Sequence, residues 1–305
     1  MGMGVRSRSA QGVHRLVVES VEDLTPGMRR VVFAGPGVAS YVAAGPHVPN
    51  IKLYFPVPGA ELDLPVKGDG RWSFAPGQRE RVRTYTVRTL DRDASRLAVD
   101  FVRHGDEGLA SAWAERAAPG AELGALGGGG LVVRDGGWVL LAGDETALPA
   151  IGSTLERFSA ERPEQRGLAL IEVAGPEEEQ DLAAPDGFEV RWLHRRARAG
   201  EATSSGPAAP AGTTTLLQEA LAAVELPAAE LAAGQVRIWV SAESAVVRFA
   251  RAHLKRLGFD RRHQLIIGYW HRGMTETGYT RSTDHDRERG ELADVLPGQE
   301  HAHAH

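Results

Sequence analysis

The chain of 305 residues contains no cysteine. This absence excludes disulfide bonds, thiol nucleophiles, cysteine-ligated zinc and the usual iron–sulfur clusters. If the protein carries out redox chemistry, an organic cofactor must therefore carry the electrons.

Net positive charge and long apolar segments are missing as well. The formal net charge is −5, which argues against a nucleic-acid partner, so any anionic ligand must meet a local basic cluster. No stretch approaches the length of a membrane span. Residues 1–12 lack the apolar segment of a secretory signal, and Arg6 stands where a lipidation motif needs Ser or Thr. These absences predict a cytoplasmic protein without membrane insertion.

Residues 13–133 consist of short β-rich runs separated by Gly and Pro. In one of them, Ile51, Leu53 and Phe55 fall on one face of a strand, while Lys52 and Tyr54 share the other. Several such runs without long helices between them predict an antiparallel β-barrel or sandwich. The runs are His14–Val21, Arg29–Ala34, Ile51–Phe55, Arg83–Arg88 and Leu97–Arg103.

Residues 134–273 have a different pattern, in which continuous apolar runs alternate with helical segments. This alternation is typical of a parallel sheet that helices cover on both faces, and it predicts a nucleotide-binding α/β domain. The apolar runs are Trp138–Ala142, Leu168–Val173, Phe188–Leu193, Val236–Ser241 and Leu265–Trp270. The helical segments are Ala147–Phe158, Thr214–Ala223 and Ser244–Leu257.

Two segments are expected to lie outside this framework. Arg196–Thr213 is rich in Ala, Gly, Ser and Pro and is predicted to be a mobile surface loop. Residues 274–305 form a polar, charged C-terminal tail that ends in three histidines separated by alanines. A solvated tail is a better explanation of these histidines than a metal site.

The run from Arg83 to Arg88 is the most informative motif. Strand alternation places Arg83 and Tyr85 on one face, so a cation and an aromatic ring can contact the same ligand. A flavin dinucleotide needs both, because its ring packs on an aromatic platform and its pyrophosphate binds an arginine fork. Thr86 and the backbone of Val87 could contact the polar edge of the ring. A half-exposed strand with surface Arg and Thr is the structural alternative.

A glycine-containing turn follows the next strand. It begins with His104 and leads into a short helix near Ala110, whose free N–H groups would attract a phosphate, with the Ser111 hydroxyl as a further donor. An ordinary turn before a helix accounts for the same residues. The run Gly127–Gly130 lacks the Lys and Ser or Thr of a phosphate-binding loop, and a hinge between the domains fits it better.

The third motif, Gly143–Ile151, follows the first strand of the α/β half. Ligands in such sheets bind at the carboxyl ends of the strands, near the first strand–helix turn. Asp144, Glu145 and Thr146 stand at that turn, with Thr146 as the expected N-cap of the helix. A capped helix start without ligand is the structural alternative.

In this order, the motifs resemble the siderophore-interacting protein family of FAD-containing ferric-siderophore reductases, which is related to the ferredoxin–NADP reductases. The resemblance covers residues 13–273. The matching residues are Arg83–Arg88, Val99–Val102 with His104-Gly105, Ala110–Trp113, Gly143–Ile151, Gly268–Trp270 and Arg272-Gly273.

The resemblance implies an FAD-binding β-barrel followed by an NAD(P)-binding α/β domain. It gives no general base and no metal ligand, because electrons would pass through the FAD. The FAD-binding residues it implies are Arg83, Tyr85, Thr86, Val87, His104, Ala110, Ser111, Asp144, Glu145, Thr146 and Trp270. Tyr269 and Trp270 could instead simply pack between the domains.

The same resemblance implies a ferric siderophore as substrate, with Lys52, His271 and Arg272 as binding residues. Many relatives carry a basic residue where this chain has Gly127–Gly130, a role that Arg134 could take over. The electron donor is NADPH or NADH, and in some relatives ferredoxin. Arg191, Arg195 and Arg196 cluster where a 2′-phosphate could be recognised, as NADPH would require. Exposed arginines are common, so the choice between NADPH, NADH and ferredoxin stays open.

Two other functions remain open at this point. The protein could be a flavin-containing carrier that binds a ferric siderophore without reducing it, or a general flavin reductase. A nucleotide-binding regulator would leave the Arg83–Arg88 strand unexplained.

Overall fold

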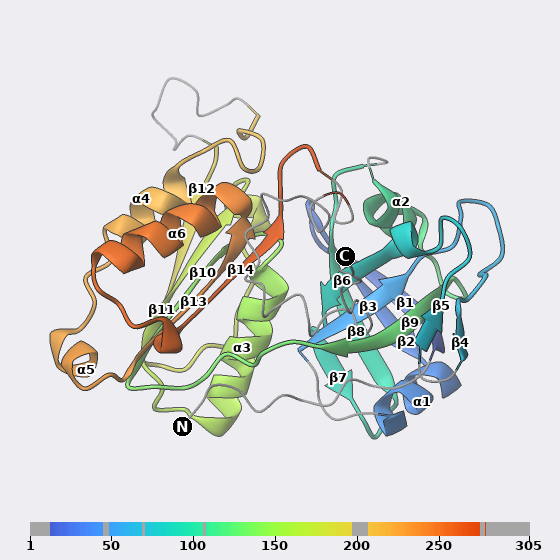
Figure 1. Ribbon diagram of the computed structural model, residues 1–305, viewed down its shortest axis with the longest axis horizontal. Coiled ribbons are helices and arrows are strands. Elements are labelled where there is room, and N and C mark those ends of the chain that lie inside the picture. The colour runs from blue at the N-terminus through green and yellow to red at the C-terminus, as the bar shows by residue number, and fades with distance from the viewer. Residues whose placement is uncertain are drawn as a thin grey trace, which may run out of the picture.

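The structure is a computed structural model, and it describes residues 13–44, 49–68, 71–105, 108–196, 207–274 and 278. The first twelve residues, the middle of the Arg196–Thr213 segment and nearly all of the C-terminal tail lie outside these residues, as do the expectations about them. The described residues form two units side by side (Figure 1). We call them the β domain and the α/β domain.

The β domain is built on a seven-stranded antiparallel sheet in the order β6-β3-β9-β1-β2-β8-β7. Its strands are β1 (His14–Thr25), β2 (Met28–Ala34), β3 (Asn50–Tyr54), β6 (Val82–Thr86), β7 (Thr89–Asp91), β8 (Arg96–Val102) and β9 (Glu122–Gly129). Strands β4 (Val66–Gly68) and β5 (Arg71–Ser73) form a separate hairpin, and the helices are α1 (Pro36–Ala44), η1 (Arg79–Arg81) and α2 (Leu109–Arg116).

The two ends of this sheet meet, so the sheet is curled like a barrel. Strands β6 and β7 stand at opposite ends of the strand order, yet only Val87 and Arg88 separate them in the chain. The N–H of Val87 donates to Pro49 O at 3.1 Å, and the N–H of Arg88 donates to Ala98 O at 2.9 Å. The expected antiparallel β domain is confirmed.

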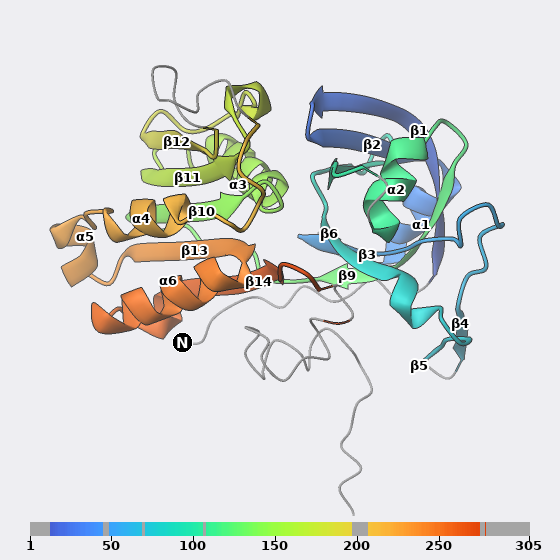
Figure 2. The ribbon, with the colours of Figure 1, turned by 90° about the horizontal axis from the view of Figure 1, so that it is seen from above.

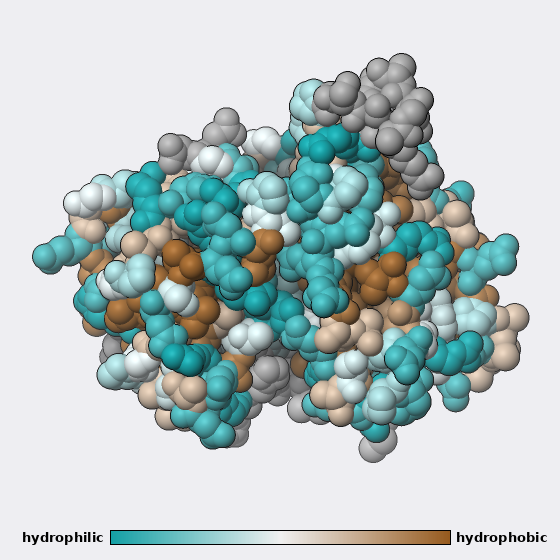
Figure 3. Space-filling view, turned by 180° about the vertical axis from the view of Figure 1, so that it is seen from behind, coloured by the Kyte–Doolittle hydropathy of each residue, from teal (hydrophilic) through white to brown (hydrophobic). Residues whose placement is uncertain are grey.

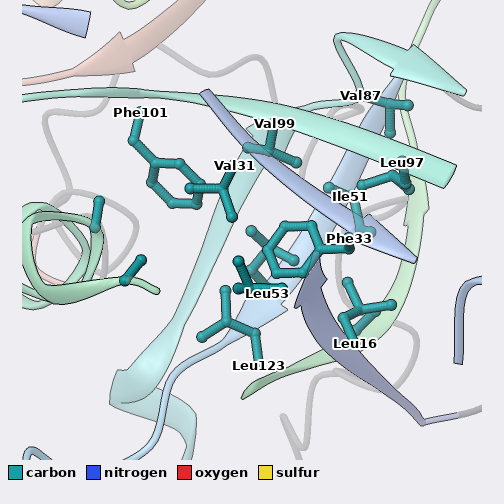
Figure 4. Packing of buried hydrophobic residues seen from close by; sticks show 14 of the residues in the cluster. Leu16, Val31, Phe33, Ile51, Leu53, Val87, Leu97, Val99, Phe101 and Leu123 are labelled. Atoms are coloured by element: carbon teal, nitrogen blue, oxygen red, sulfur yellow. The ribbon is translucent and has the colours of Figure 1, made fainter. Parts of the chain in front are cut away.

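The core of the β domain follows from strand alternation. Ile51 and Leu53 are fully buried in it together with Phe55, as the sequence predicts, and they pack against Phe33 and Phe101 (Figure 4).

The α/β domain has a five-stranded parallel sheet in the order β12-β11-β10-β13-β14. Its strands are β10 (Trp138–Asp144), β11 (Gly167–Val173), β12 (Phe188–His194), β13 (Val236–Glu243) and β14 (Gln264–Trp270). Its helices are α3 (Leu148–Glu161), η2 (Pro176–Glu178), α4 (Leu216–Ala222), α5 (Ala228–Ala232), α6 (Ser244–Arg256) and η3 (Arg261–His263).

Helices cover this sheet on both faces, so its central strand is apolar on both sides. Val139 and Leu141 of β10 pack against α3, whereas Leu140 and Ala142 pack on the side of α4 and α6 (Figures 1 and 2). The strand order reverses beside β10, where β11 lies on one side and β13 on the other. Ligands bind at such a switch point, outside the carboxyl ends of the strands.

The turn between β1 and β2 packs against the α/β domain. Met28 is buried in the same apolar cluster as α3, and Leu24 packs against that cluster. Glu178 of η2 accepts hydrogen bonds from Thr25 Oγ1 at 2.5 Å and from Gly27 N at 3.0 Å. Seen from behind, apolar side chains appear as separate patches among polar ones across both domains (Figure 3).

One expectation about the connection is wrong. Gly127, Gly128 and Gly129 are not a hinge, because they belong to β9, where Gly128 and Gly129 pair with Ile51 and Asn50 of β3. Backbone pairing fixes these glycines, so the connection between the domains begins after them.

Candidate functional site

A cleft of about 2710 Å³ lies between the two domains. The β domain contributes β6 and the start of α2 to it, and the α/β domain contributes α3, α6 and every residue of β14. Binding sites for a single small molecule usually measure about 300–1,000 Å³. The cleft therefore has room for a large cofactor and a second ligand.

Strand β6 brings Arg83, Tyr85 and Thr86 to the cleft, as the sequence predicts. The guanidinium of Arg83 donates to the carbonyl oxygens of Glu80 at 2.7 Å and Val82 at 2.8 Å. Val87, whose backbone was the fourth predicted element of this motif, does not line the cleft, because its side chain is buried in the β-domain core and its N–H donates to Pro49 O.

An aromatic cluster supports the β-domain side of the cleft. The ring of Tyr85 lies 4.5 Å from that of Phe101, centroid to centroid, and Phe101 lies 5.8 Å from Trp113 of α2. Phe55 packs between them, 6.4 Å from Tyr85 and 5.8 Å from Trp113. Close packing of rings restricts each of them, so Tyr85 is held in place by apolar contacts.

The turn before α2 is closed by Ser111. Its hydroxyl donates to Gly105 O at 2.8 Å and accepts from His104 N at 3.0 Å. His104, Ala110 and Ser111 all line the cleft. The Ser111 hydroxyl, predicted as a phosphate donor, is thus engaged within the turn, and phosphate binding by the N–H groups at the start of α2 stays a prediction.

Lys52 of β3 also lines the cleft, on the strand face opposite Ile51 and Leu53. Its Nζ donates to Thr84 Oγ1 at 3.4 Å, on the neighbouring strand β6.

Asp144 organises the α/β-domain side, although it does not line the cleft itself. One carboxylate oxygen accepts from Thr146 N at 3.0 Å and from Thr146 Oγ1 at 2.5 Å. The other accepts from Glu243 N at 3.0 Å and from the indole Nε1 of Trp270 at 2.8 Å. Burial, followed by the charge of Glu145, raises the pKa of Asp144 to about 6. Its four hydrogen bonds connect the ends of three strands.

The expectation that Thr146 caps α3 is wrong. Ala147 is the N-cap residue, and no side chain caps the helix. The Thr146 hydroxyl is engaged by Asp144, so Thr146 faces the cleft as part of the turn.

Buried carboxylates recur at the ends of the neighbouring strands. Glu243, at the end of β13, accepts from Ala245 N at 2.5 Å and from Arg272 N at 3.2 Å. Glu172 of β11 accepts from Leu217 N at 3.2 Å and from Thr214 Oγ1 at 3.0 Å. Asp144, Glu172 and Glu243 are each about 5% exposed. Together they attach the loops at the switch point to the sheet.

Arg195 forms an ion pair that faces the cleft. It binds both oxygens of Glu145, at 2.8 and 2.7 Å, and it donates to Ala209 O at 3.1 Å. Arg191 and Arg196, the other two arginines predicted to recognise a 2′-phosphate, pair with Glu189 and Glu177.

The end of β14 brings two of the three predicted residues of that segment to the cleft. Trp270 and His271 line it, whereas Arg272 is exposed and lies outside the lining. Tyr269 also lines the cleft, where burial raises the pKa of its hydroxyl and hydrogen bonds with Ser241 and Thr86 oppose the shift. Thr86 belongs to the β domain, so this hydroxyl bridges the two domains.

Sequence reasoning missed the cations of α6 and η3. Arg248, Arg251 and Lys255 follow one another at spacings of three and four residues, so they share a face of α6, and Arg261 and Arg262 continue the row. We call these five residues the basic row. The 3–4 spacing was a usable signal, but it is equally typical of an ordinary solvated helix face.

The cleft is far more cationic than the rest of the chain. Among its described lining residues, twelve are Arg or Lys and four are Asp or Glu, although the chain as a whole has a formal charge of −5. Arg134 is not among them, so it does not compensate for the uncharged Gly127–Gly130. Such a lining attracts anionic ligands.

The residues that the structure describes lack two kinds of feature. They contain no group of three or more His, Asp or Glu side chains arranged to hold a metal ion. None of the helices there is both long enough and apolar enough to cross a membrane.

Two family models match the chain, one for each domain. Residues 17–131 match the siderophore-interacting FAD-binding domain, and residues 136–273 match the siderophore-interacting protein model. FAD is therefore the cofactor of the β domain.

Similar proteins include an uncharacterized protein of Mycobacterium tuberculosis, 38% identical over 87% of this chain and 92% of its own length. The NADPH-dependent ferric-chelate reductase of Escherichia coli is 29% identical over 87% of this chain and 96% of its own. The ferric vibriobactin reductase ViuB of Vibrio cholerae is 29% identical over 75% of this chain and 79% of its own.

Solved structures agree with these matches. A siderophore utilization protein from T. fusca superimposes with a TM-score of 0.75 at 35% identity, covering 88% of this chain and 97% of its own. A ferredoxin NADP⁺ reductase from Neisseria gonorrhoeae shares the fold, with a TM-score of 0.53 at 15% identity over 85% of this chain and 99% of its own. With the fold, both domains and relatives above 30% identity in agreement, the chain belongs to the siderophore-interacting protein family.

Proposed function

We propose that this protein is an NAD(P)H-dependent reductase that uses FAD to reduce ferric siderophores and release Fe(II). The observation that carries the proposal is the interdomain cleft. It brings the Arg83–Tyr85 strand of the FAD-binding domain opposite the switch point of a nucleotide-binding sheet, and its lining is strongly cationic.

The β-domain side of the cleft fits FAD. Tyr85 offers an aromatic surface supported by Phe101. Arg83 lines the cleft, and its guanidinium donates hydrogen bonds to the carbonyl oxygens of Glu80 and Val82. The start of α2 presents N–H groups to the same space, beside His104. Arg83, Tyr85, Thr86 and the residues from His104 to Ser111 would hold the cofactor. Bound FAD supplies the change from a two-electron donor to single-electron transfer.

The α/β-domain side fits a nicotinamide nucleotide. Glu145, Thr146 and Trp270 line the cleft at the carboxyl ends of the strands, where nucleotides bind in such sheets. Asp144 and the other buried carboxylates hold these loops in place, and Arg195 is held by Glu145. The arrangement supports nucleotide entry opposite Tyr85.

The cationic lining supports a ferric siderophore as electron acceptor. Lys52 stands on the β-domain side and the basic row on the α/β side, so an anionic complex would meet positive charge from both domains. Each Fe(III) takes up one electron, and one NAD(P)H therefore serves two ferric complexes. Fe(II) binds hard oxygen ligands more weakly, which releases the iron from the siderophore.

The names of two relatives support this reading. A ferric vibriobactin reductase and an NADPH-dependent ferric-chelate reductase are each 29% identical to this chain. The second name favours NADPH as the donor here.

Anaerobic absorbance spectroscopy of the FAD-loaded protein tests the proposal. We expect NADPH to bleach the flavin band, and a ferric siderophore then to restore it while Fe(II) appears. A flavin that no nicotinamide nucleotide bleaches would point to ferredoxin as donor. Reduced protein that binds the ferric siderophore without reoxidation would indicate a carrier, and equal turnover with any electron acceptor would indicate a general flavin reductase.

A further inference from the structure

An ion pair crosses the cleft from the β domain to α3. Arg88, two residues after Thr86, binds both carboxylate oxygens of Glu156 in α3, at 2.6 and 2.5 Å. The Arg88 side chain is only 7% exposed, and that of Glu156 is 39% exposed. Both residues line the cleft. A bidentate pair of this kind fixes both distance and direction between its partners.

The α3 side of this contact is shaped for the guanidinium. A Cβ added at Gly152, one turn before Glu156, would lie 3.2 Å from an Arg88 nitrogen and 3.4 Å from its central carbon. The absence of a side chain at Gly152 therefore lets the guanidinium lie directly against the helix.

The β-domain side is also reinforced. Asp100 of β8 lies 3.6 Å from the Arg88 guanidinium and binds Arg30 of β2 at 2.7 and 2.8 Å. The Asp100 side chain is 1% exposed. Arg30, Asp100, Arg88 and Glu156 thus form one chain of charges that runs from the β-domain sheet into α3.

We propose that the Arg88–Glu156 pair is a positioning element that sets the spacing between β6 and α3 across the cleft. Arg88 is two residues from Thr86 on the flavin side, and α3 begins immediately after the turn that contains Glu145 and Thr146. The pair therefore connects the two sides on which donor and acceptor must meet. Its kinetic consequence rests on the proposed function.

The size of the expected loss in rate depends on how far the reacting groups move apart when the pair is removed. A displacement of about 1 Å between reacting groups can slow a reaction about 100-fold. Another interdomain contact, from Glu178 to Thr25 and Gly27, lies at the β1–β2 turn, and none of its three residues lines the cleft. It can keep the domains together after the Arg88–Glu156 pair is removed.

The first test is Glu156→Gln, with Asp63→Asn as the matched control. Asp63 binds Arg81 with the same bidentate geometry, at 2.8 and 2.7 Å, but both residues belong to the β domain and neither lines the cleft. Because the chain has no cysteine, spin labels can be placed on cysteines introduced at the exposed positions Arg96 and Leu231, one in each domain. Double electron–electron resonance spectroscopy then measures the distance distribution between the two labels, and hence the spacing of the domains, in the FAD-free protein.

We expect Glu156→Gln to broaden the distance distribution and to lower the limiting rate of flavin reduction at saturating NADPH at least about 10-fold. FAD affinity should stay within about twofold of that of the parent protein, because Arg83 and Tyr85 are unchanged. Asp63→Asn should leave both the distribution and the rate unchanged. Arg88→Lys, which keeps the charge but loses the fork, should give an intermediate rate.

A cross-link separates positioning from direct action on the ligand. Gly27 N lies 3.0 Å from a Glu178 carboxylate oxygen, so cysteines at these two positions come from opposite domains and lie within reach of a short bifunctional thiol reagent, which can tether the domains independently of Arg88. In the Glu156→Gln background without spin-label cysteines, the tether should recover the rate. An unchanged distribution in Glu156→Gln would overturn the proposal, and so would a lost rate that the tether does not recover. If NADPH and NADH both fail to reduce the parent protein, the proposed function fails, while the distance measurement still decides whether the pair sets the spacing.

Discussion

The two sides of the cleft are supported by different physical means. On the β-domain side, Tyr85 rests on Phe101 and Phe55, and the support is apolar. On the α/β side, Trp270 and the turn at Thr146 are held by the buried carboxylate of Asp144, and the support is ionic and hydrogen-bonded. Apolar packing does not depend on protonation, whereas a carboxylate network does. A change in pH should therefore alter the stability of the α/β side and leave that of the β-domain side unchanged.

The division matches the proposed tasks. A flavin ring that stays bound through many turnovers suits a rigid aromatic platform. A nucleotide that enters and leaves suits loops attached by hydrogen bonds, because these can be exchanged with water.

Phe101→Ala should have the largest effect on stability. Phe101 is fully buried, and removing a buried phenyl ring costs about 3–5 kcal/mol. The loss should be the same at pH 5 and pH 8, since no charge is involved, and Tyr85 should lose its support. Urea denaturation at both pH values measures it. A loss that depends strongly on pH would contradict the apolar description of this side.

Asp144→Asn should lower the free energy of unfolding by less, about 1–3 kcal/mol. In the wild-type protein the carboxylate accepts from Glu243 N and Trp270 Nε1, whereas the amide of the variant would point N–H donors of its own at one or both of them. The pKa of Asp144, about 6 in the folded protein, exceeds its value in the unfolded chain. This group therefore adds stability as pH falls from about 6 to 4, and the variant lacks that gain.

The deficit of the Asp144→Asn variant should accordingly be larger at pH 5 than at pH 7.5. Unfolding at the two pH values measures the change, and the tryptophan emission should shift as Trp270 loses its partner. A deficit that shrinks toward acid pH would show that the carboxylate does not titrate as described.

Lys255→Gln should have a smaller effect, confined to ligand binding. Lys255 is exposed on α6 and belongs to the basic row, so its loss should weaken an anionic ferric complex about two- to fivefold, less at high salt. Fluorescence titration at low and high salt measures this. Equal losses at both salt concentrations would argue against a long-range electrostatic role for the row.

Arg96→Gln should have no measurable effect. Arg96 pairs with Glu19 on the surface of the β domain, away from the cleft, and exposed pairs contribute little. Unfolding and FAD binding should both match the parent protein. A clear loss of stability or of FAD affinity would mean that surface ion pairs outside the cleft also support the site.

The fold could largely be predicted from the sequence, since strand and helix periods are local. Alternation along the strand predicts which face Ile51 and Leu53 bury, and the continuous apolar runs of the α/β domain predict a sheet covered on both faces. Arg83 and Tyr85 could be assigned to one site because they lie two residues apart on one strand.

Other features could not be predicted, because they depend on distant residues. Arg88 and Glu156 are 68 positions apart, and no local pattern pairs them. Asp144 was expected beside the ligand, yet its carboxylate is occupied by Trp270, 126 positions away. In the sequence, the basic row has the pattern of an ordinary solvated helix face, and only the packing of the two domains shows that it lines the cleft.

Titration of the FAD-free protein with FAD shows whether the flavin binds at Arg83 and Tyr85. We expect one FAD per chain, an affinity at least about tenfold weaker in Tyr85→Ala and in Arg83→Gln, and an unchanged affinity in Lys255→Gln. Equally tight binding by all four proteins would place the flavin elsewhere and contradict the account of the cleft.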